Sequence, residues 1–568
     1  STKSDFRVQY NSWYDHMLDI DADNIERSFY EIEQGLSDHG VPPLDAYVID
    51  DGWNNYKAPF WSFNKKFPNK LTDATDQCHK LGSTFGLWLG PRGGYTAATP
   101  RFAKKIEKGG NGYLNSDSMD ICVGSEKYLQ NLEKFLTDTC TEFDIQYLKL
   151  DGFCLKPCTN PKHDHITGGE NDMYFVTEMW QRWIDLFTRL RESRAKDNKP
   201  LWINMTCYVN PSPWWLQYVN SVWLQNSMDI GFANNLEQQA QVDAEITYRD
   251  SMYYDFMCTR ALQFPAKNIY NHEPIYGNTA KVEYTDEEFE KFLFWNACRG
   301  QAFNELYLSY NKMNSAKWRI LARMLRWQKA NHHILKNAML LGGDPAENNI
   351  YAYAAWTKAG EGIIALRNPT DEKTDLTLTL NKLMGCPENL RAVKCYNVYN
   401  TTGADSLDLF SYGDKMQITL APFEMKIFQF GDRDNRCLAP ENTNDFTLSF
   451  TVSNNADANI CRGKDAAIWI ANGVLHGTFG GCKIQASLVD CAHHITFVRY
   501  KNKMVRLFMD RQLVDSAYAP EAAPQIATDD LASSAANFSV ADGSTPFEEL
   551  MDLKAVLSGS RKFKRKRK

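Results

Sequence analysis

A lysine and an aspartate two residues apart end an apolar run of the chain, in the segment YLKLDG at residues 147–152. If this run is a strand, residues i and i+2 point to the same side, so Lys149 and Asp151 both face whatever the strand end lines. An ammonium beside a carboxylate favours the ionised acid, which suits Asp151 to attack an electrophilic carbon. A strand-end salt bridge followed by a glycine turn is the simpler interpretation of the same residues.

A second apolar run, LDAYVI at residues 44–49, ends in two adjacent aspartates, Asp50 and Asp51, followed by Gly52 and Trp53. Carboxylate oxygens accept hydrogen bonds from sugar hydroxyls, and an indole ring packs on the apolar face of a pyranose. We therefore expect Asp50, Asp51 and Trp53 to contact a sugar, together with Trp88 at the end of a third apolar run. Asp-Gly is also ordinary turn chemistry.

The elements that must position these residues alternate between short apolar runs and helical periods. Strands are predicted at residues 8–13, 45–49, 85–89, 146–150, 201–206, 221–224, 267–270 and 301–305, and helices at 25–36, 73–81, 126–142, 176–190, 237–248, 286–297 and 316–330. Strands joined by crossover helices predict parallel pairing, and eight units fit an α/β fold of the (β/α)8 barrel type. Catalytic groups of a barrel lie at the C-terminal strand ends, where Asp50, Asp51, Trp88, Asp151 and Cys207 fall. A doubly wound sheet is the alternative, but no Gly-rich phosphate loop follows the first strand.

The periodicity changes to two after about residue 337, where leucines at 376, 378 and 380 alternate with threonines. This pattern predicts an antiparallel sheet, and further strand-like runs at 446–452, 495–500 and 505–510 predict another. The predicted organisation is a catalytic barrel at 1–335, a small antiparallel β-sandwich at 336–432, a linker at 433–444, a lectin-like sandwich of the laminin-G or concanavalin type at 445–558, and a disordered basic tail at 559–568.

Composition narrows the class of protein. The 568 residues carry 63 basic and 70 acidic side chains, a net charge of −7, which argues against a nucleic-acid surface along the whole chain. The basic run at 561–568 is the exception, and such a run is more often a solvated tail than a patch for anions. No apolar run is long enough to span a bilayer, and the first residues do not resemble a signal peptide. We expect a mature secreted or cell-surface protein, with the cytoplasm as the alternative, and predict no oligomeric state.

Four candidate metal ligands follow Asp151 within one loop: Cys154, Cys158, His163 and His165. Two thiols and two imidazoles could hold zinc, but this spacing is not that of a common zinc finger. A disulfide and unlinked loop residues are the alternatives, and the second is the simplest. We therefore predict neither a metal nor a cofactor.

The segments DDGW at 50–53 and KLD at 149–151, on a barrel followed by a small sandwich, resemble the α-galactosidase clan, and within it the melibiase-like glycoside hydrolases. The resemblance covers about residues 7–430. It implies that Asp151 is the nucleophile and that Asp229, in the segment 222–230, is the acid/base, with Asp250 and Asp255 as rival acids. The residues that it implies against the sugar are Asp50, Asp51, Lys149 and Cys207. The motif around Arg92 departs from the pattern of the clan, which leaves its role open.

The function implied by this resemblance is a retaining, exo-acting α-glycosidase that releases terminal α-linked galactose or N-acetylgalactosamine. Such a reaction needs two carboxyl groups about 5–5.5 Å apart. The lectin-like domain, with Trp469 as a candidate glycan contact, favours N-acetylgalactosamine slightly. Arg249, expected against the substrate, is a candidate contact of the sugar 2-position, as are His272 and Trp214. A raffinose-synthase-like transglycosidase, an inactive glycan-binding protein and a metalloenzyme are the alternatives.

Overall fold

The computed structural model describes residues 6–233, 236, 239–399, 406–431, 445–520, 535–545 and 547–551. The predicted linker and the predicted basic tail lie outside the described residues. No helix of the described ranges is long and apolar enough to cross a bilayer.

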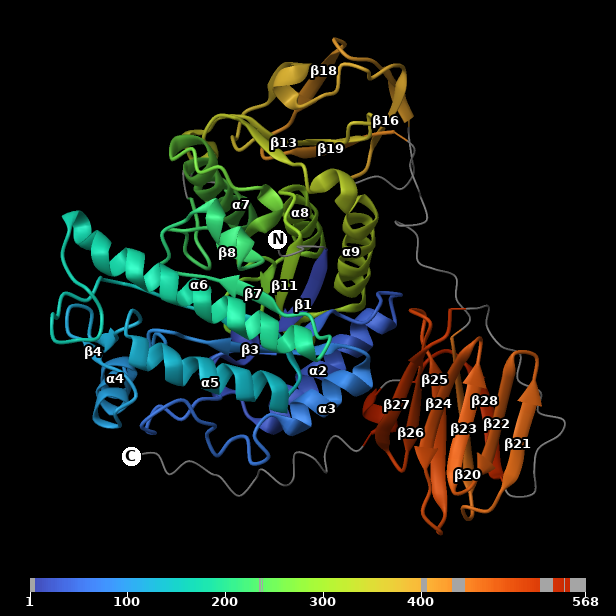
Figure 1. Cartoon of the computed structure of the whole chain (residues 1–568). Coiled ribbons are helices and arrows are strands. Elements are labelled where there is room, and N and C mark those ends of the chain that lie inside the picture. Colours follow the sequence, from blue (N-terminus) through green and yellow to red (C-terminus); the bar gives the residue numbers. More distant parts are fainter. Residues whose placement is uncertain are drawn as a thin grey trace.

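Nine parallel strands form one curled sheet in the first part of the chain (Figure 1). They are β1 (Arg7–Asn11), β2 (Ala46–Ile49), β3 (Thr84–Leu89), β6 (Ile145–Leu150), β7 (Trp202–Met205), β8 (Ser221–Trp223), β9 (Ile269–Tyr270), β10 (Ile275–Tyr276) and β11 (Phe303–Leu308). The sheet order is β10-β11-β1-β2-β3-β6-β7-β8-β9. Its two end strands, β9 and β10, belong to the single segment 269–276, so the sheet closes on itself and the two fill one strand position.

The prediction of a (β/α)8 barrel is confirmed, with a seventh strand that is interrupted. The predicted strand at 267–270 is only its first half, and the predicted strand at 301–305 lies two to three residues further along the chain. The barrel interior is filled mainly by aromatic rings, among them Tyr147, Trp202, Trp223 and Phe303. Polar side chains are therefore concentrated toward the C-terminal ends of the strands.

Helices surround the sheet; α4 was not predicted, and α7 begins four residues and ends six residues later than predicted. The helices of the barrel are α1 (Trp13–His16), α2 (Ala22–Ser37), α3 (Thr72–Leu81), α4 (Thr99–Lys108), α5 (Glu126–Glu142), α6 (Met173–Lys196), α7 (Gln241–Tyr254), α8 (Asp286–Cys298) and α9 (Ser315–Leu335). Helix α5 has the predicted bounds because Ser125 caps it, its hydroxyl accepting from the Tyr128 N–H. A short hairpin of β4 (Leu114–Asn115) and β5 (Asp120–Ile121) precedes α5, and a 3-10 turn at Pro213–Gln217 links β7 to β8.

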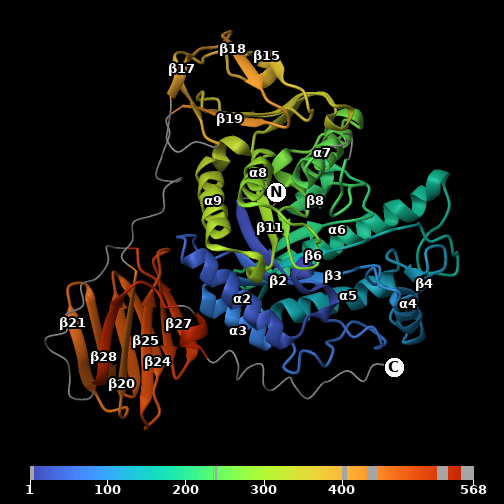
Figure 2. The same ribbon diagram turned by 180° about the vertical axis from the view of Figure 1, so that it is seen from behind.

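Two antiparallel regions follow the barrel (Figures 1 and 2). The first has a six-stranded sheet, β12-β13-β14-β19-β16-β17, and a two-stranded sheet, β15-β18. Its strands are β12 (Met339–Gly342), β13 (Tyr351–Trp356), β14 (Gly362–Arg367), β15 (Thr374–Thr379), β16 (Val393–Asn397), β17 (Ser406–Phe410), β18 (Lys415–Leu420) and β19 (Met425–Phe430).

The last region is a sandwich of a five-stranded sheet, β27-β26-β25-β20-β28, and a four-stranded sheet, β21-β22-β23-β24. Its elements are β20 (Phe446–Val452), β21 (Ala458–Gly463), β22 (Ala466–Ala471), β23 (Val474–Phe479), β24 (Cys482–Ser487), β25 (His493–Arg499), β26 (Met504–Met509), β27 (Gln512–Tyr518), β28 (Ala535–Asp542) and the helix α10 (Phe547–Leu550). Trp469 on β22 alternates with the core residues Ile468 and Ile470, and its ring stacks on His476 at 5.1 Å. Trp469 therefore faces away from the sandwich core.

This last sandwich packs against α2 and α3 of the barrel (Figure 2). Arg506 of β26 donates to Glu33 of α2 at 2.5 Å, and both side chains are almost completely buried. Asn502 donates to the Ser37 hydroxyl and to the Val41 carbonyl, both at 3.0 Å. The barrel and the terminal sandwich therefore share a packed interface that contains the buried ion pair of Arg506 and Glu33.

Candidate functional site

Asp151 follows β6 at the C-terminal end of the barrel strands, and its backbone N–H donates to the Leu89 carbonyl at 2.9 Å. Its carboxylate accepts three side-chain hydrogen bonds: from Trp88 Nε1 to Oδ2 at 3.1 Å, from the Tyr95 hydroxyl to Oδ1 at 3.1 Å, and from the Thr206 hydroxyl to Oδ1. The side chain is only partly buried. Asp151 is therefore both fixed in orientation and accessible to a ligand.

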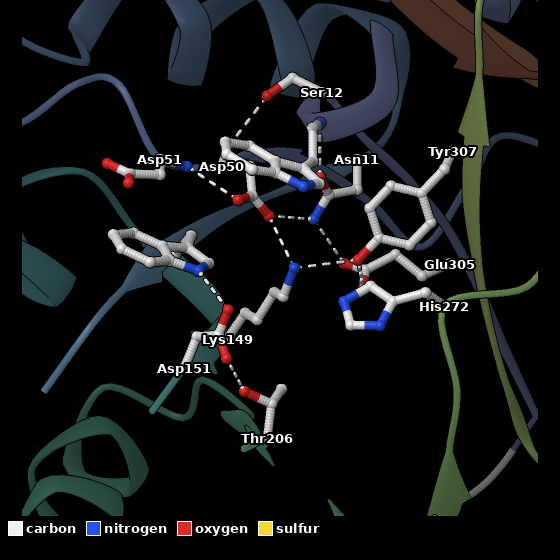
Figure 3. A network of polar contacts seen from close by, with 12 residues as sticks. Asn11, Ser12, Asp50, Asp51, Lys149, Asp151, Thr206, His272, Glu305 and Tyr307 are labelled. Atoms are coloured by element: carbon white, nitrogen blue, oxygen red, sulfur yellow. Dashed lines mark hydrogen bonds and ion pairs between the residues drawn. The ribbon is translucent and has the colours of Figure 1, made fainter. Parts of the chain in front are cut away.

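Lys149 lies at the centre of a buried polar network (Figure 3). Its Nζ donates to Asp50 Oδ2 at 2.9 Å and to the Tyr307 hydroxyl at 3.0 Å. Burial lowers the pKa of Lys149, but the negative charges of Asp50, Glu305 and Asp151 together raise it above its ordinary value. The side chain is thus a permanent ammonium. It lies against Asp50 and acts on Asp151 through space, whereas the strand spacing alone predicted contact with Asp151.

Asp50 is enclosed by donors from three strand ends. Its Oδ2 also accepts from Asn11 Nδ2 at 2.8 Å, its Oδ1 accepts from the Asp51 N–H at 2.9 Å, and its own N–H donates to the Ser12 hydroxyl at 3.0 Å. Burial raises the pKa of Asp50, and the Lys149 charge opposes that rise. Asp50 and Lys149 therefore form a rigid polar floor under the strand ends.

Sequence reasoning missed the second carboxylate of this floor, Glu305 of β11. Its Oε1 accepts from Gln9 and Asn11, both at 2.9 Å, and its Oε2 accepts from the Tyr307 hydroxyl at 2.8 Å and from the Tyr270 hydroxyl. These residues lie within strands, so no turn marks them. The one available signal is the alternation of Gln9 and Asn11 along β1, which places two amides on the same face of a strand.

Asp229 lies in the loop that follows β8. The Tyr14 hydroxyl donates to its Oδ2 at 3.1 Å, and Nδ1 of His272 lies 3.2 Å from its Oδ1. Burial raises the pKa of Asp229 above 3.8, the Lys149 charge opposes this rise and the Asp151 charge adds to it. The side chain keeps 36% of its surface exposed. Asp229 is thus a carboxyl group that holds its proton more strongly than an ordinary aspartate and can still reach a ligand.

Arg249 of α7 holds the loop that carries Asp229. Its guanidinium donates to Glu273 Oε1 at 2.9 Å, to the Asp229 carbonyl at 2.5 Å and to the Ser227 hydroxyl. The side chain is fully buried. Its donors face the loop, so Arg249 is a positioning residue in this structure, and its predicted contact with the sugar stays a prediction.

Asp151 and Asp229 face the same opening of the barrel. They follow β6 and β8, and β7, which ends just before Cys207, lies between these two strands. Burial raises the pKa of the Cys207 thiol, and the negative charges of both aspartates raise it further. Cys207 is only partly buried. The three side chains therefore lie at neighbouring strand ends, close enough for the charges of the two aspartates to act on Cys207, and all three are partly exposed.

No protein-family model matches the sequence, and no curated protein matches it. Solved structures do. An α-galactosidase of glycoside hydrolase family 36 from Geobacillus stearothermophilus aligns with a TM-score of 0.51 and 14% identity over 75% of this chain, which spans 55% of that enzyme. The chain has the α-galactosidase fold. The α-galactosidase I of Mortierella vinacea aligns with a TM-score of 0.48 and 14% identity over 76% of this chain and 97% of that one.

Asp51 is the second aspartate of the DDGW segment, and in this α-galactosidase fold it lies apart from the Lys149 network. Its carboxyl group points away from the ammonium (Figure 3), and its Oδ1 accepts from the Tyr56 hydroxyl at 2.8 Å. Burial, together with the charges of Asp50 and Asp151, raises the pKa of Asp51 to about 7 although Tyr56 opposes this. The folded protein therefore binds a proton at Asp51 that the unfolded chain releases near pH 3.8.

Asp51→Asn is expected to stabilise the protein at alkaline pH. The stability linked to a raised pKa is present below the unfolded value and is lost as pH rises through the folded value, so it is lost between about pH 4 and pH 7. The neutral amide avoids this loss, with a gain of at most about 4 kcal/mol at pH 8 and little change at pH 4. Urea unfolding of both proteins at the two pH values measures it, and an equal effect at both would contradict the burial of a charge at this site.

Trp53 does not reach the pocket of the α-galactosidase fold, contrary to prediction. Its indole is fully buried, stacks on Trp61 and Phe135, and donates to the Trp88 carbonyl at 2.8 Å. It therefore supports the end of β3. Trp88 itself is the residue that reaches the site, through its hydrogen bond to Asp151.

The two rival acids have other roles. Asp250 is fully buried, pairs with Arg299 at 2.7 Å and accepts from Tyr353 at 2.8 Å, which ties α7 to the small sandwich. Asp255 pairs with Arg260 at 2.7 Å at the end of α7. Neither belongs to the network around Asp151.

A cavity of about 370 Å³ adjoins the site and is lined in part by Cys207, Tyr208, Ser227 and Arg260. Of the three candidates for the sugar 2-position, His272 contacts Asp229, Arg249 is buried, and Trp214 is 73% exposed on the turn before β8.

The structure shows what Arg92 contacts. Its guanidinium pairs with Asp120 at 2.6 Å, and its backbone N–H donates to the Gly152 carbonyl. Arg92 therefore fixes the turn directly after Asp151.

Proposed function

We propose that this protein is a retaining, exo-acting α-glycosidase that releases terminal α-linked N-acetylgalactosamine or galactose from glycans. The proposal is supported by the pair Asp151 and Asp229, which follow the strands on either side of β7, the first oriented by three donors and the second with a raised pKa. Two carboxyl groups in different surroundings are the requirement of a double displacement.

In the proposed mechanism, an Asp151 oxygen attacks the anomeric carbon while Asp229 gives its proton to the leaving glycosidic oxygen. The bond to the leaving group breaks and a glycosyl ester of Asp151 forms. Water then attacks the same carbon, Asp229 takes a proton from it, and the ester bond to Asp151 breaks. The two inversions release the sugar with its original anomeric configuration, and both side chains return to their starting states.

The polar floor supports recognition of sugar hydroxyls. Lys149 and Asp50 present fixed charges beneath the pocket, and a buried charge-assisted hydrogen bond rejects a ligand that lacks the matching hydroxyl. The Geobacillus enzyme was crystallised with raffinose, whose terminal unit is an α-linked galactose, so raffinose is the first natural substrate to test. The cavity beside Cys207 offers room for a group larger than a hydroxyl, which favours N-acetylgalactosamine.

The test is a panel of nitrophenyl α- and β-glycosides, with the anomer of the released sugar followed by NMR. We expect cleavage of the α-galactoside or the α-N-acetylgalactosaminide, no cleavage of the β-anomers, and release of the α-anomer first. Release of the β-anomer first would rule out retention. Transfer to an added sugar in preference to water would identify a transglycosidase, and binding of sugar without cleavage of any glycoside would identify a glycan-binding protein.

A further inference from the structure

A second cluster of reactive side chains lies outside the candidate active site. The sulfur or nitrogen donors of Cys122, Cys158, His163 and His165 all lie within 4.8 Å of one another. They come from two segments: Cys122 directly follows β5, and the other three lie in the loop between β6 and α6. The loop thus returns to the hairpin before α5 at this one point.

The His165 imidazole has the outer contact that is usual for a metal ligand, whereas Nε2 of His163 lies 3.0 Å from Asn160 Nδ2. His165 is 8% exposed, its Nδ1 lies 3.1 Å from the Ile166 carbonyl, and its Nε2 is buried without a hydrogen-bond partner in the described structure. A proton on Nδ1 that is donated to this carbonyl leaves the Nε2 lone pair free, which is the usual outer contact of a metal-bound histidine. His163 places Nδ1 3.3 Å from Cys158 Sγ, and its ring stacks on Tyr113 at 4.4 Å.

We propose that Cys122, Cys158, His163 and His165 bind a structural zinc ion. Zinc bonds of about 2.3 Å to sulfur and 2.0–2.1 Å to nitrogen place neighbouring donors of a tetrahedron about 3.3–3.8 Å apart. The contact between His163 and Cys158 already has this length, and a small contraction brings the other donors to it. Two thiols and two imidazoles are a standard donor set for structural zinc, and four protein ligands leave no open position for water.

The chemistry of the two thiols fits this assignment. The Sγ atoms of Cys122 and Cys158 lie within 4.8 Å of each other, close enough to share one ion after a small contraction. A thiolate is the form that binds zinc. The cysteines in the described ranges are free thiols, so no disulfide occupies the pair.

The proposed site differs from the sequence analysis in two respects. It holds a metal where none was predicted, and its fourth ligand is Cys122 instead of Cys154. Cys154 lies in the same loop but lines the cavities next to the active site. Its backbone N–H donates to the Tyr208 carbonyl at 3.1 Å. Local spacing selects Cys154, whereas the cysteine that lies next to Cys158 and the two histidines comes from a hairpin earlier in the chain.

The surrounding contacts indicate what the ion would do. Asp164, between the two histidines, accepts from the Glu126 and Lys127 N–H groups at the start of α5, at 3.1 and 2.9 Å. Arg182 of α6 donates to the Gly124 and Asp164 carbonyls at 2.6 and 2.9 Å. Zinc would complete this clamp, which fixes the loop that begins at Asp151 against the neighbouring α5 segment. Its role is therefore to keep one wall of the active site in place.

The test is the zinc content of the full chain, purified without a metal-affinity step and measured by mass spectrometry of the elements. We expect about one zinc per chain, a decrease of at least about tenfold in Cys122→Ser and in Cys158→Ser, and no decrease in Cys154→Ser. Cys154 is the matched control because it lies in the same loop. Replacement of the metal by cobalt should give the thiolate-to-cobalt absorption band and the visible bands of a tetrahedral site.

Two results would overturn the proposal. One is less than about a tenth of a zinc per chain from zinc-supplemented cells, with no thiolate band on addition of cobalt. The other is a Cys122–Cys158 disulfide in the native protein. The wild-type zinc content and cobalt spectrum decide the question even if the serine variants do not fold. Neither measurement depends on glycosidase activity, so the zinc site and the proposed function succeed or fail separately.

Discussion

Asp151→Asn is expected to lower turnover of an α-glycoside by at least about 10⁴-fold, since the loss of an attacking nucleophile removes the covalent route altogether. The amide is almost isosteric and can still accept from Thr206 and Tyr95, so the pocket should keep its shape. Steady-state kinetics with the best nitrophenyl α-glycoside of the panel measure the loss. Sugar should still raise the melting temperature of the variant, because binding stabilises the folded state whether or not the bond is cleaved.

The matched control for this change is Asp255→Asn. Asp255 is also an aspartate of the barrel, but it pairs with Arg260 at the end of α7. We expect its turnover to change by less than about threefold, as for a surface ion pair of small energetic value. Full activity of Asp151→Asn, or an equal loss in the Asp255 variant, would show that the nucleophile is elsewhere.

Asp229→Asn is expected to have an effect that depends on the leaving group. A natural glycoside needs a proton on its leaving oxygen, so its turnover should decrease by about 10²–10⁴-fold. The dinitrophenolate group of a dinitrophenyl glycoside leaves without a proton. With this substrate, the variant should therefore form the glycosyl ester at a rate much closer to that of the wild type. The pH profile of kcat/KM gives a second test, because a general acid is active only while it is protonated.

The sign of that pH effect follows from the raised pKa of Asp229. The wild-type enzyme should lose kcat/KM on the alkaline side at a higher pH than an ordinary aspartate would give, and Asp229→Asn should lack this alkaline decrease. The same loss for both leaving groups, or an unchanged alkaline decrease, would move the acid role to another residue. Asp255→Asn again serves as the control, since it tests a rival acid in the same experiments.

The strand ends of the barrel could be predicted from sequence because each is a local event: an apolar run, then polar residues and a glycine. For this reason the places of Asp50 and Asp151 and the parallel pairing of the strands could be predicted from the sequence. Glu305 was not, since it lies inside β11 and only closure of the sheet brings it next to β1. Arg249 and Trp53 have the residue types of sugar ligands, but both are buried, and their polar atoms donate to other groups of the protein. Cys122 was missed for a similar reason, because its neighbours belong to a later loop.

The buried Glu33–Arg506 pair joins the terminal sandwich to helix α2 of the barrel. Cutting the chain near Gly431 would remove Arg506, the charged partner of Glu33, and would expose the surface around Tyr30, which Phe547 covers at 5.2 Å between ring centres. The barrel and small sandwich produced without the terminal sandwich should therefore aggregate and be less stable than the full chain. The terminal sandwich is therefore expected to move together with the barrel as one body.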